Sequence, residues 1–215
     1  MDGNAAFQKK KMAQHGRLRV ITRSRRTGTE YEKLSLFVPE TFRIEWRYLF
    51  DDMAPGEIIK FVHCLTCPKK YAGISKSSWK HLEIEFLQRA IKNNYLKKDI
   101  SKVLGALESY LHGAAQRTDH QKTRHHLTPK VRGGKNGNSK VIRLPKRFHG
   151  AWHYVFGHLL PDEVIKFVRV FLQGKGLHKL KRRWSKDEIL ALRSIIQQNS
   201  MREVTEKIKA LFSQK

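Results

Sequence analysis

Four histidines in the second half of the chain have a spacing that suits divalent-metal chemistry. His125 and His126 are adjacent, and His149 and His153 are four residues apart. On a helix, residues four apart share one face, so the last two imidazoles would lie side by side, and a neighbouring strand would bring the doublet over them. Converging imidazoles predict a divalent-metal site. The alternative is an ordinary pair of surface histidines.

The stretch from His125 to His153 resembles the motif of the HNH endonucleases, the family of the ββα-metal fold. Its doublet is followed by an apolar residue and Pro129, and then by Gly133 and Gly134. The family motif has this order, followed by an Asn that opens a second strand and by one or two histidines on a helix. The resemblance therefore includes nearly all the residues of this chain that suggest chemistry.

The resemblance implies a role for each histidine. His126 would be the general base that takes a proton from the attacking water, because the pKa of water itself is far too high. His125 and His149 would ligate one divalent cation, with His153 as a third ligand or an outer-shell partner. Mg²⁺ or Mn²⁺ is expected first, with Zn²⁺ as an alternative. The metal would stabilise charge on the scissile phosphate and the leaving oxygen.

One position departs from the family motif. The Asn that orients the general base falls at Lys140 by spacing, which argues for an inactive site. Asn138, two residues earlier, is an alternative if the loop is reshaped. Pro145 and Phe148 stand where many family members carry a zinc-binding cysteine pair, so apolar packing replaces a structural zinc.

The charge of the chain predicts a polyanionic partner. Its 215 residues carry a formal net charge of +25. This excess indicates nucleic acid, with DNA favoured and RNA as an alternative. A membrane is not expected, because the chain shows no long apolar run and no lipidation motif. The basic residues beside the histidines are expected to hold the phosphate backbone: Lys130, Arg132, Lys146 and Arg147.

The two cysteines do not make a disulfide framework and favour a cytoplasmic location. The polar, lysine-rich N-terminus shows no signal peptide. Cys64 and Cys67 form a single CxxC pair with His63 and His81 nearby. The alternatives for this pair are a small zinc site and two thiols on a helix.

The elements that would position the histidines occur twice. Residues 39–62 and 145–168 align without gaps and share eleven identities in 24 positions. Matches on both sides extend the repeats. The predicted organisation is a basic tail, a degenerate first repeat, a linker and a second repeat: residues 1–15, 16–112, 113–121 and 122–215.

The first repeat lacks the histidines. Arg43 and Arg47 stand where the second repeat has His149 and His153, and a constant offset of 106 residues places the doublet at 19–20. Two guanidinium groups would not hold a cation, but they would grip phosphate oxygens. The first repeat is therefore expected to bind nucleic acid without cutting it.

The expected fold class is α+β and mostly helical. Each tandem repeat predicts a β-hairpin and a helix, a ββα-metal-like unit, followed by a second helix and a helical hairpin. In the second repeat the strands are expected at 124–128 and 140–144, with helices opening at Pro145 and Pro161. The two copies are expected to form an intramolecular pseudo-dimer, with a homodimer as the alternative.

Two functions compete at this stage. The leading interpretation is a metal-dependent HNH-like endonuclease that hydrolyses the phosphodiester bonds of DNA. The alternative is a catalytically inactive, basic DNA- or RNA-binding protein, such as a ribonucleoprotein component. The four histidines favour the enzyme, and Lys140 favours the binding protein. A purely structural histidine-metal module would leave the charge unexplained.

Overall fold

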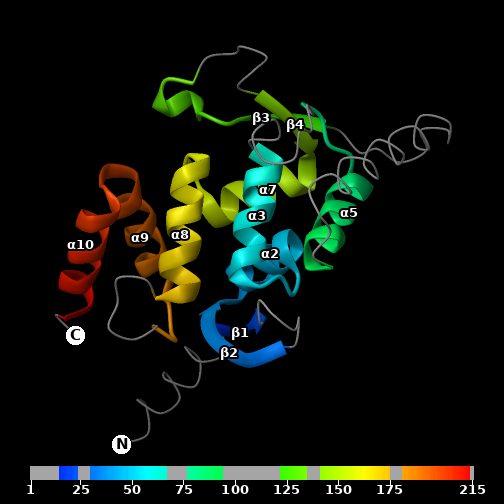
Figure 1. The fold of residues 1–215 in the computed structure, drawn as a ribbon. Coiled ribbons are helices and arrows are strands. Elements are labelled where there is room, and N and C mark those ends of the chain that lie inside the picture. Colours follow the sequence, from blue (N-terminus) through cyan, green and yellow to red (C-terminus); the bar gives the residue numbers. More distant parts are fainter. Residues whose placement is uncertain are drawn as a thin grey trace, which may run out of the picture. The chain divides into compact units, whose positions relative to one another are not determined.

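The computed structural model is mostly helical (Figure 1). Across its described residues it has seven α-helices and two antiparallel sheets of two strands each, which confirms the expected class at this level. Lys140, Asn138, Cys67 and the linker lie outside the described residues. None of the described helices is long and apolar enough to span a membrane. The described ranges are 15–23, 30–66, 77–93, 122–134, 141–174 and 181–213.

Each sheet is a hairpin that leads directly into a helix. Proline ends the second strand both times, with φ and ψ of −52° and 139° at Pro39 and −52° and 136° at Pro145. Such extended backbone suits the step from strand to helix. The elements are β1 (His15–Arg23), β2 (Glu30–Pro39) and α2 (Glu40–Phe50), then β3 (Lys122–His126), β4 (Val141–Pro145) and α7 (Lys146–Phe156).

The first strand of the second hairpin differs from its expected bounds. It ends at His126, because a bend follows and Pro129 leads into the 3-10 turn η1 (Lys130–Arg132). Proline lacks the N–H that a strand ladder needs, so pairing stops before it. The expected strand at 124–128 was therefore placed two residues too late.

The remaining helices are α3 (Pro55–Thr66), α5 (His81–Lys92), α8 (Pro161–Gln173), α9 (Lys186–Gln198) and α10 (Met201–Ser213). Hydrogen bonds cap the starts of the last two. Glu188 N donates to Ser185 Oγ at 3.2 Å, and Ser185 N donates to Glu188 Oε2 at 2.9 Å, a capping box that opens α9. Ser200 N donates to Glu203 Oε2 at 2.7 Å before α10.

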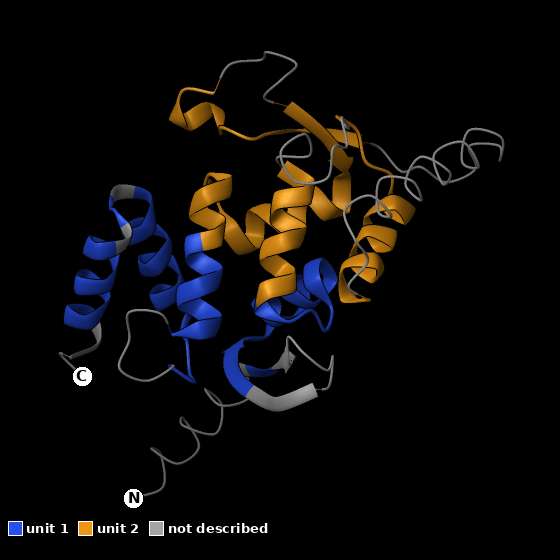
Figure 2. Cartoon of the chain, in the orientation of Figure 1, with its two compact units in different colours: residues 1–55, 166–215 blue, residues 56–165 orange. Residues whose placement is uncertain are grey.

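The chain forms two compact units, and each contains segments of both repeats (Figure 2). Unit 1 consists of residues 1–55 and 166–215, and unit 2 of residues 56–165. Unit 1 therefore combines the first hairpin and α2 with α9 and α10 of the second repeat. Unit 2 combines the second hairpin and α7 with helices of the first repeat.

The second strand of each hairpin pairs with the other repeat. In unit 1, Phe37 N donates to Arg182 O at 2.7 Å, and Trp184 N donates to Phe37 O at 2.8 Å. In unit 2, Arg143 N donates to the carbonyl of residue 77 at 2.7 Å, and Trp79 N donates to Arg143 O at 2.9 Å. Matching positions of the repeats thus make matching hydrogen bonds, each time with the opposite repeat.

Aromatic packing joins the same segments. In unit 1 the rings of Phe42 and Trp46 on α2 each lie 5.4 Å from that of Phe171, which lies 5.2 Å from Trp184. In unit 2 the ring of Phe148 on α7 lies 6.3 Å from that of Phe61. Large buried rings dominate core energetics. The helix that follows each hairpin therefore packs against a residue of the opposite repeat.

Candidate metal centre

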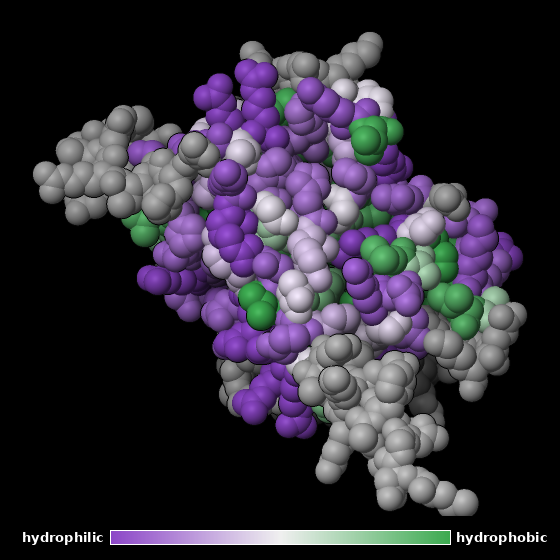
Figure 3. Space-filling model, turned by 180° about the vertical axis from the view of Figure 1, so that it is seen from behind, coloured by the Kyte–Doolittle hydropathy of each residue, from purple (hydrophilic) through white to green (hydrophobic). Residues whose placement is uncertain are grey.

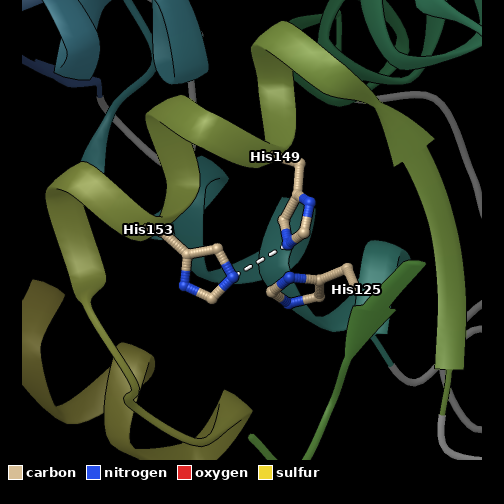
Figure 4. Close-up of side chains that lie close together, drawn as sticks. All are labelled: His125, His149 and His153. Atoms are coloured by element: carbon tan, nitrogen blue, oxygen red, sulfur yellow. Dashed lines mark hydrogen bonds between the residues drawn. The ribbon is translucent and has the colours of Figure 1, made fainter. Parts of the chain in front are cut away.

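Three histidines of unit 2 turn their rings toward one another (Figure 4). His125 comes from β3, and His149 and His153 come from α7. Ligand atoms of the three side chains all lie within 4.8 Å of one another. The ring centroids are 5.0 Å apart for His125 and His149, 5.3 Å for His125 and His153, and 4.6 Å for the helical pair. We call these residues the three-histidine centre.

Strand alternation and helical spacing together create this centre. Side chains of a strand point to opposite faces in turn, so Thr123 and His125, two residues apart, both face α7. His125 is buried, 5% exposed, with its ring 5.7 Å from that of Trp152. The half-buried His149 and His153 lie one turn apart beside the apolar stripe of α7.

Hydrogen bonds define the protonation of the helical pair. His153 Nδ1 lies 2.9 Å from the carbonyl of Gly157, which only accepts, so this nitrogen carries the proton. The Nε2 atoms of His149 and His153 lie 2.8 Å apart, so in the absence of a metal one of them donates to the other. When His149 Nε2 is the donor, His149 Nδ1 accepts from the Thr123 hydroxyl at 2.6 Å. This assignment follows from the donors and acceptors available.

Thr123 was not identified in the sequence, although it lies two residues before His125 and thus on the same face of β3. Its hydroxyl also lies 3.4 Å from the carbonyl of Leu144. If the Thr123 hydroxyl donates to the Leu144 carbonyl instead, its oxygen accepts a hydrogen bond from His149 Nδ1. The Nε2 of neutral His149 then has a lone pair. Thr123 can therefore orient His149 in either tautomer.

The centre suits a bound cation. His125 Nδ1 is buried and has no hydrogen-bond partner among the described residues. A buried polar atom without a partner costs about 1–3 kcal/mol. A ligand that accepts the lone pairs of the three imidazoles would remove this cost, so the residues present fit a metal ion.

Burial favours the neutral form of His125 and His149. It lowers the pKa of His125 to about 3, with smaller contributions from repulsion by His149, His153 and His126. Burial also lowers the pKa of His149 to about 4, together with repulsion by His153 and His126. Neutral imidazoles offer lone pairs to a metal without competition from protons.

The donor set favours a borderline transition metal. Three imidazoles and no carboxylate make up the centre. Imidazole nitrogen suits Zn²⁺, Ni²⁺ and Cu²⁺, whereas Mg²⁺ and Mn²⁺ prefer oxygen ligands. The donor set therefore fits a borderline ion such as Zn²⁺, the alternative expected from the sequence, better than Mg²⁺ or Mn²⁺.

Glycines shape the turn that follows β3. Gly133 closes η1 with a φ of +79°, a left-handed conformation that glycine adopts without strain. Gly134 N donates to Pro129 O at 3.1 Å, and a Cβ on Gly134 would overlap the carbonyl oxygen of Thr128. The two glycines therefore permit the tight return of the chain after the histidines.

The expected phosphate-binding residues have different environments. Lys130, Lys146 and Arg147 are exposed. Arg132 forms an ion pair with the nearly buried carboxylate of Glu163 and lies 3.5 Å from the carbonyl of His158. Arg132 thus has a structural contact within unit 2, and a phosphate contact for it stays a prediction.

The hairpin register changes one expected correspondence. Pro39 pairs with His15 and Pro145 with Lys122, which aligns Leu18 with His125 and Arg19 with His126. The constant offset had placed the doublet at 19–20, one residue too late. A register shift between Ile21 and Thr22 explains the difference, because it adds one residue to the first hairpin.

An ion pair occupies the corresponding place in unit 1. Arg43 donates to Glu40, three residues before it on α2, and this contact raises the pKa of Arg43. Gly16 aligns with Thr123, and a Cβ there would overlap the side chains of Glu40 and Arg43. Arg47 is exposed. Of the two arginines of the first repeat that were expected to bind phosphate, Arg43 thus has its charge compensated by Glu40.

No protein-family model, curated protein or solved structure matches this chain. The three-histidine centre and the basic residues around it are the features from which a function is inferred.

Proposed function

We propose that the chain is a metal-dependent endonuclease of the HNH type, which hydrolyses the phosphodiester bonds of DNA. The observation that carries this proposal is the convergence of His125, His149 and His153 from a hairpin and the helix that follows it. We further propose that the chain contains two tandem ββα-metal-like units, of which only the second keeps its chemistry. The first is then a nucleic-acid-binding pseudo-nuclease that uses Arg43 and Arg47.

The charge near the centre supports this substrate. Residues 120–161 contain nine lysines and arginines and no aspartate or glutamate. Such a segment attracts a polyanion and repels cationic partners. Lys130, Lys146 and Arg147 would hold the phosphate backbone on either side of the scissile bond.

Each residue of the centre has a stated task. His125, His149 and His153 would hold the ion, while the Thr123 hydroxyl and the Gly157 carbonyl orient the helical pair. A bound divalent ion supplies positive charge to the scissile phosphate and the leaving oxygen. His126 would take the proton of the attacking water as general base.

An inactive nucleic-acid-binding protein is the second candidate. Lys140, in the position expected to hold the Asn that orients the general base, favours it. A misoriented His126 would leave metal binding and phosphate binding intact and remove only the cleavage.

A plasmid cleavage assay tests the proposal. Supercoiled plasmid is incubated with Zn²⁺, Mn²⁺ or Mg²⁺, with EDTA as the metal-free control. The wild type and the matched control His81→Ala, which changes an exposed histidine of α5, are expected to cut. His126→Ala is expected not to cut. Salt-sensitive binding by the wild type without cleavage under any metal would refute the enzyme and support the binding protein.

A further inference from the structure

The outer face of each hairpin carries arginines that the proposed catalytic centre does not use. In unit 2, Arg124 on β3 and Arg143 on β4 are paired across the antiparallel ladder, and both are exposed. Their neighbours His125, Ile142 and Leu144 are buried on the opposite face. The sheet thus has one face in the core and one basic face in water.

The arginine pair opposes the stability of the hairpin. Like charges directly opposite on neighbouring strands destabilise a sheet. No aspartate or glutamate occurs between residues 120 and 161 to offset the repulsion. Lys122 adds a third cation on the same face, with its Nζ 3.3 Å from Ser78 Oγ. A ligand with several negative charges would relieve this repulsion.

Unit 1 repeats the arrangement with different residues. Arg17 on β1 aligns with Arg124 by register and pairs with Phe37, which is 38% exposed. Phe37 is bridged on its other side to Arg183, whose guanidinium lies 6.0 Å from the phenyl ring. Arg17 and Arg183 are both exposed. Two arginines therefore occur on the outer hairpin face of each unit.

From these observations we infer that the outer hairpin faces, Arg124 with Arg143 and Arg17 with Arg183, bind the phosphate backbone of double-stranded DNA. This inference rests on the proposed nucleic-acid partner, but not on cleavage. A two-stranded ribbon fits the major groove of B-form DNA, whereas the deep, narrow major groove of duplex RNA does not admit it. The outer faces would thus hold the duplex at places separate from the three-histidine centre.

Salt dependence of binding tests the inference. Affinity for a short DNA duplex is measured in EDTA, so that no cleavage occurs, over a range of NaCl concentrations. Each lost phosphate contact reduces the slope of log K against log salt by about 0.9. Arg124→Gln with Arg143→Gln should therefore reduce it by about 1.8 and weaken binding about tenfold or more. The matched control Lys186→Gln with Arg202→Gln removes two exposed charges from α9 and α10 and should change the slope little.

Charge reversal separates binding from folding. Arg143→Glu replaces a repulsive cross-strand pair with an attractive one, so the melting temperature should stay equal or rise while affinity for DNA falls. Arg17→Gln with Arg183→Gln should lower the slope in the same way as the unit 2 variant.

Two results would overturn the inference. One is a salt slope in both double variants equal to that of the Lys186 and Arg202 control. The other is a reduction of the same size on an RNA duplex of the same sequence. Neither result depends on cleavage. If a variant without these arginines cuts plasmid and binds DNA normally, this inference is refuted and the proposed endonuclease is not.

Discussion

His125 occupies a core position at the expense of stability. The aligned position of unit 1 is Leu18, which is 2% exposed, and both residues lie on the inner face of their hairpin. Leucine is an apolar residue of similar size, whereas His125 leaves Nδ1 without a hydrogen bond among the described residues. The imidazole therefore has a cost that a leucine would not have.

His125→Leu is expected to stabilise the metal-free protein and abolish its response to zinc. Removal of the unsatisfied nitrogen should raise the free energy of unfolding by about 1–3 kcal/mol. Urea unfolding in EDTA measures this change. In excess Zn²⁺ the wild type should gain stability in proportion to the logarithm of metal concentration, and the variant should not. A less stable variant that still responds to zinc would contradict the proposed role of His125.

Thr123→Val tests the orientation of His149. Loss of the hydroxyl that contacts Nδ1 should weaken zinc binding about 10–100-fold, as is usual for outer-shell partners of metal ligands. Thr123→Ser keeps the hydroxyl and should retain most of the affinity. A competition titration against a zinc chelator measures both. Equal affinity in the valine variant would remove Thr123 from the centre.

Acid should destabilise the metal-free protein. The folded pKa values of His125 and His149 are lowered to about 3 and about 4, below the ordinary histidine value. The unfolded chain then binds more protons below about pH 6.5, so stability falls as pH decreases from there toward those folded pKa values. For His125 the loss at pH 4 amounts to about 3 kcal/mol at most, since one pKa unit is about 1.4 kcal/mol.

His125→Leu serves as the reference for this acid effect. Carboxylates contribute to acid unfolding in both proteins, so the difference between their curves isolates the buried imidazole. The gap in unfolding free energy should widen from pH 7 to pH 4. Parallel curves over that interval would show that the imidazole is not neutral and buried as described.

At the scale of elements, the turn after β3 determines where the doublet lies. Gly134→Ala should destabilise unit 2 by more than the roughly 1 kcal/mol typical of a glycine change, because its Cβ would overlap the Thr128 carbonyl. Gly150→Ala on α7 is the matched control, because its Cβ would meet nothing within 4 Å. That variant should be stabilised by about 0.5–1 kcal/mol. Thermal unfolding of both compares them, and a reversed order would contradict the turn geometry.

Local patterns allowed several elements to be predicted from the sequence. The spacing of His149 and His153 predicted that they share a helical face. The pattern of Ser185 and Glu188 predicted the start of α9. These features depend on residues a few positions apart. The strand limits were less accurate, because the bend before Pro129 and the register shift at Ile21 depend on pairing rather than composition.

Long-range contacts were not predictable in the same way. Nothing in the sequence indicated that Arg132 forms an ion pair with Glu163, which lies 31 residues later. Thr123 has an ordinary hydroxyl whose importance depends on α7 packing against β3. The pairing of Arg143 with residues 77–79 joins distant parts of the chain. No periodicity in one sequence specifies such partners.

At the scale of the whole molecule, each compact unit requires both repeats. Trp79 and Trp184 are 0% exposed, and each donates its backbone N–H to a hairpin strand of the other repeat. Separately produced fragments 1–112 and 113–215 should therefore lack a cooperative unfolding transition when each is monomeric. Mixing them should restore it together with a one-to-one complex. Circular dichroism measures the unfolding transition, and size-exclusion chromatography measures the complex. Two fragments that each fold as monomers would show that the units do not depend on segments of both repeats.

Segments of the repeat that lacks the histidines contact the elements that carry them in the other repeat. The hairpin that carries His125 is extended by residues 77–79, and the helix that carries His149 and His153 packs near Phe61, both from the first repeat. Deleting the first repeat would therefore remove the support of the second repeat's histidines. Mutations that impair the centre are thus expected in α3 and in residues 77–79 as well as around the histidines.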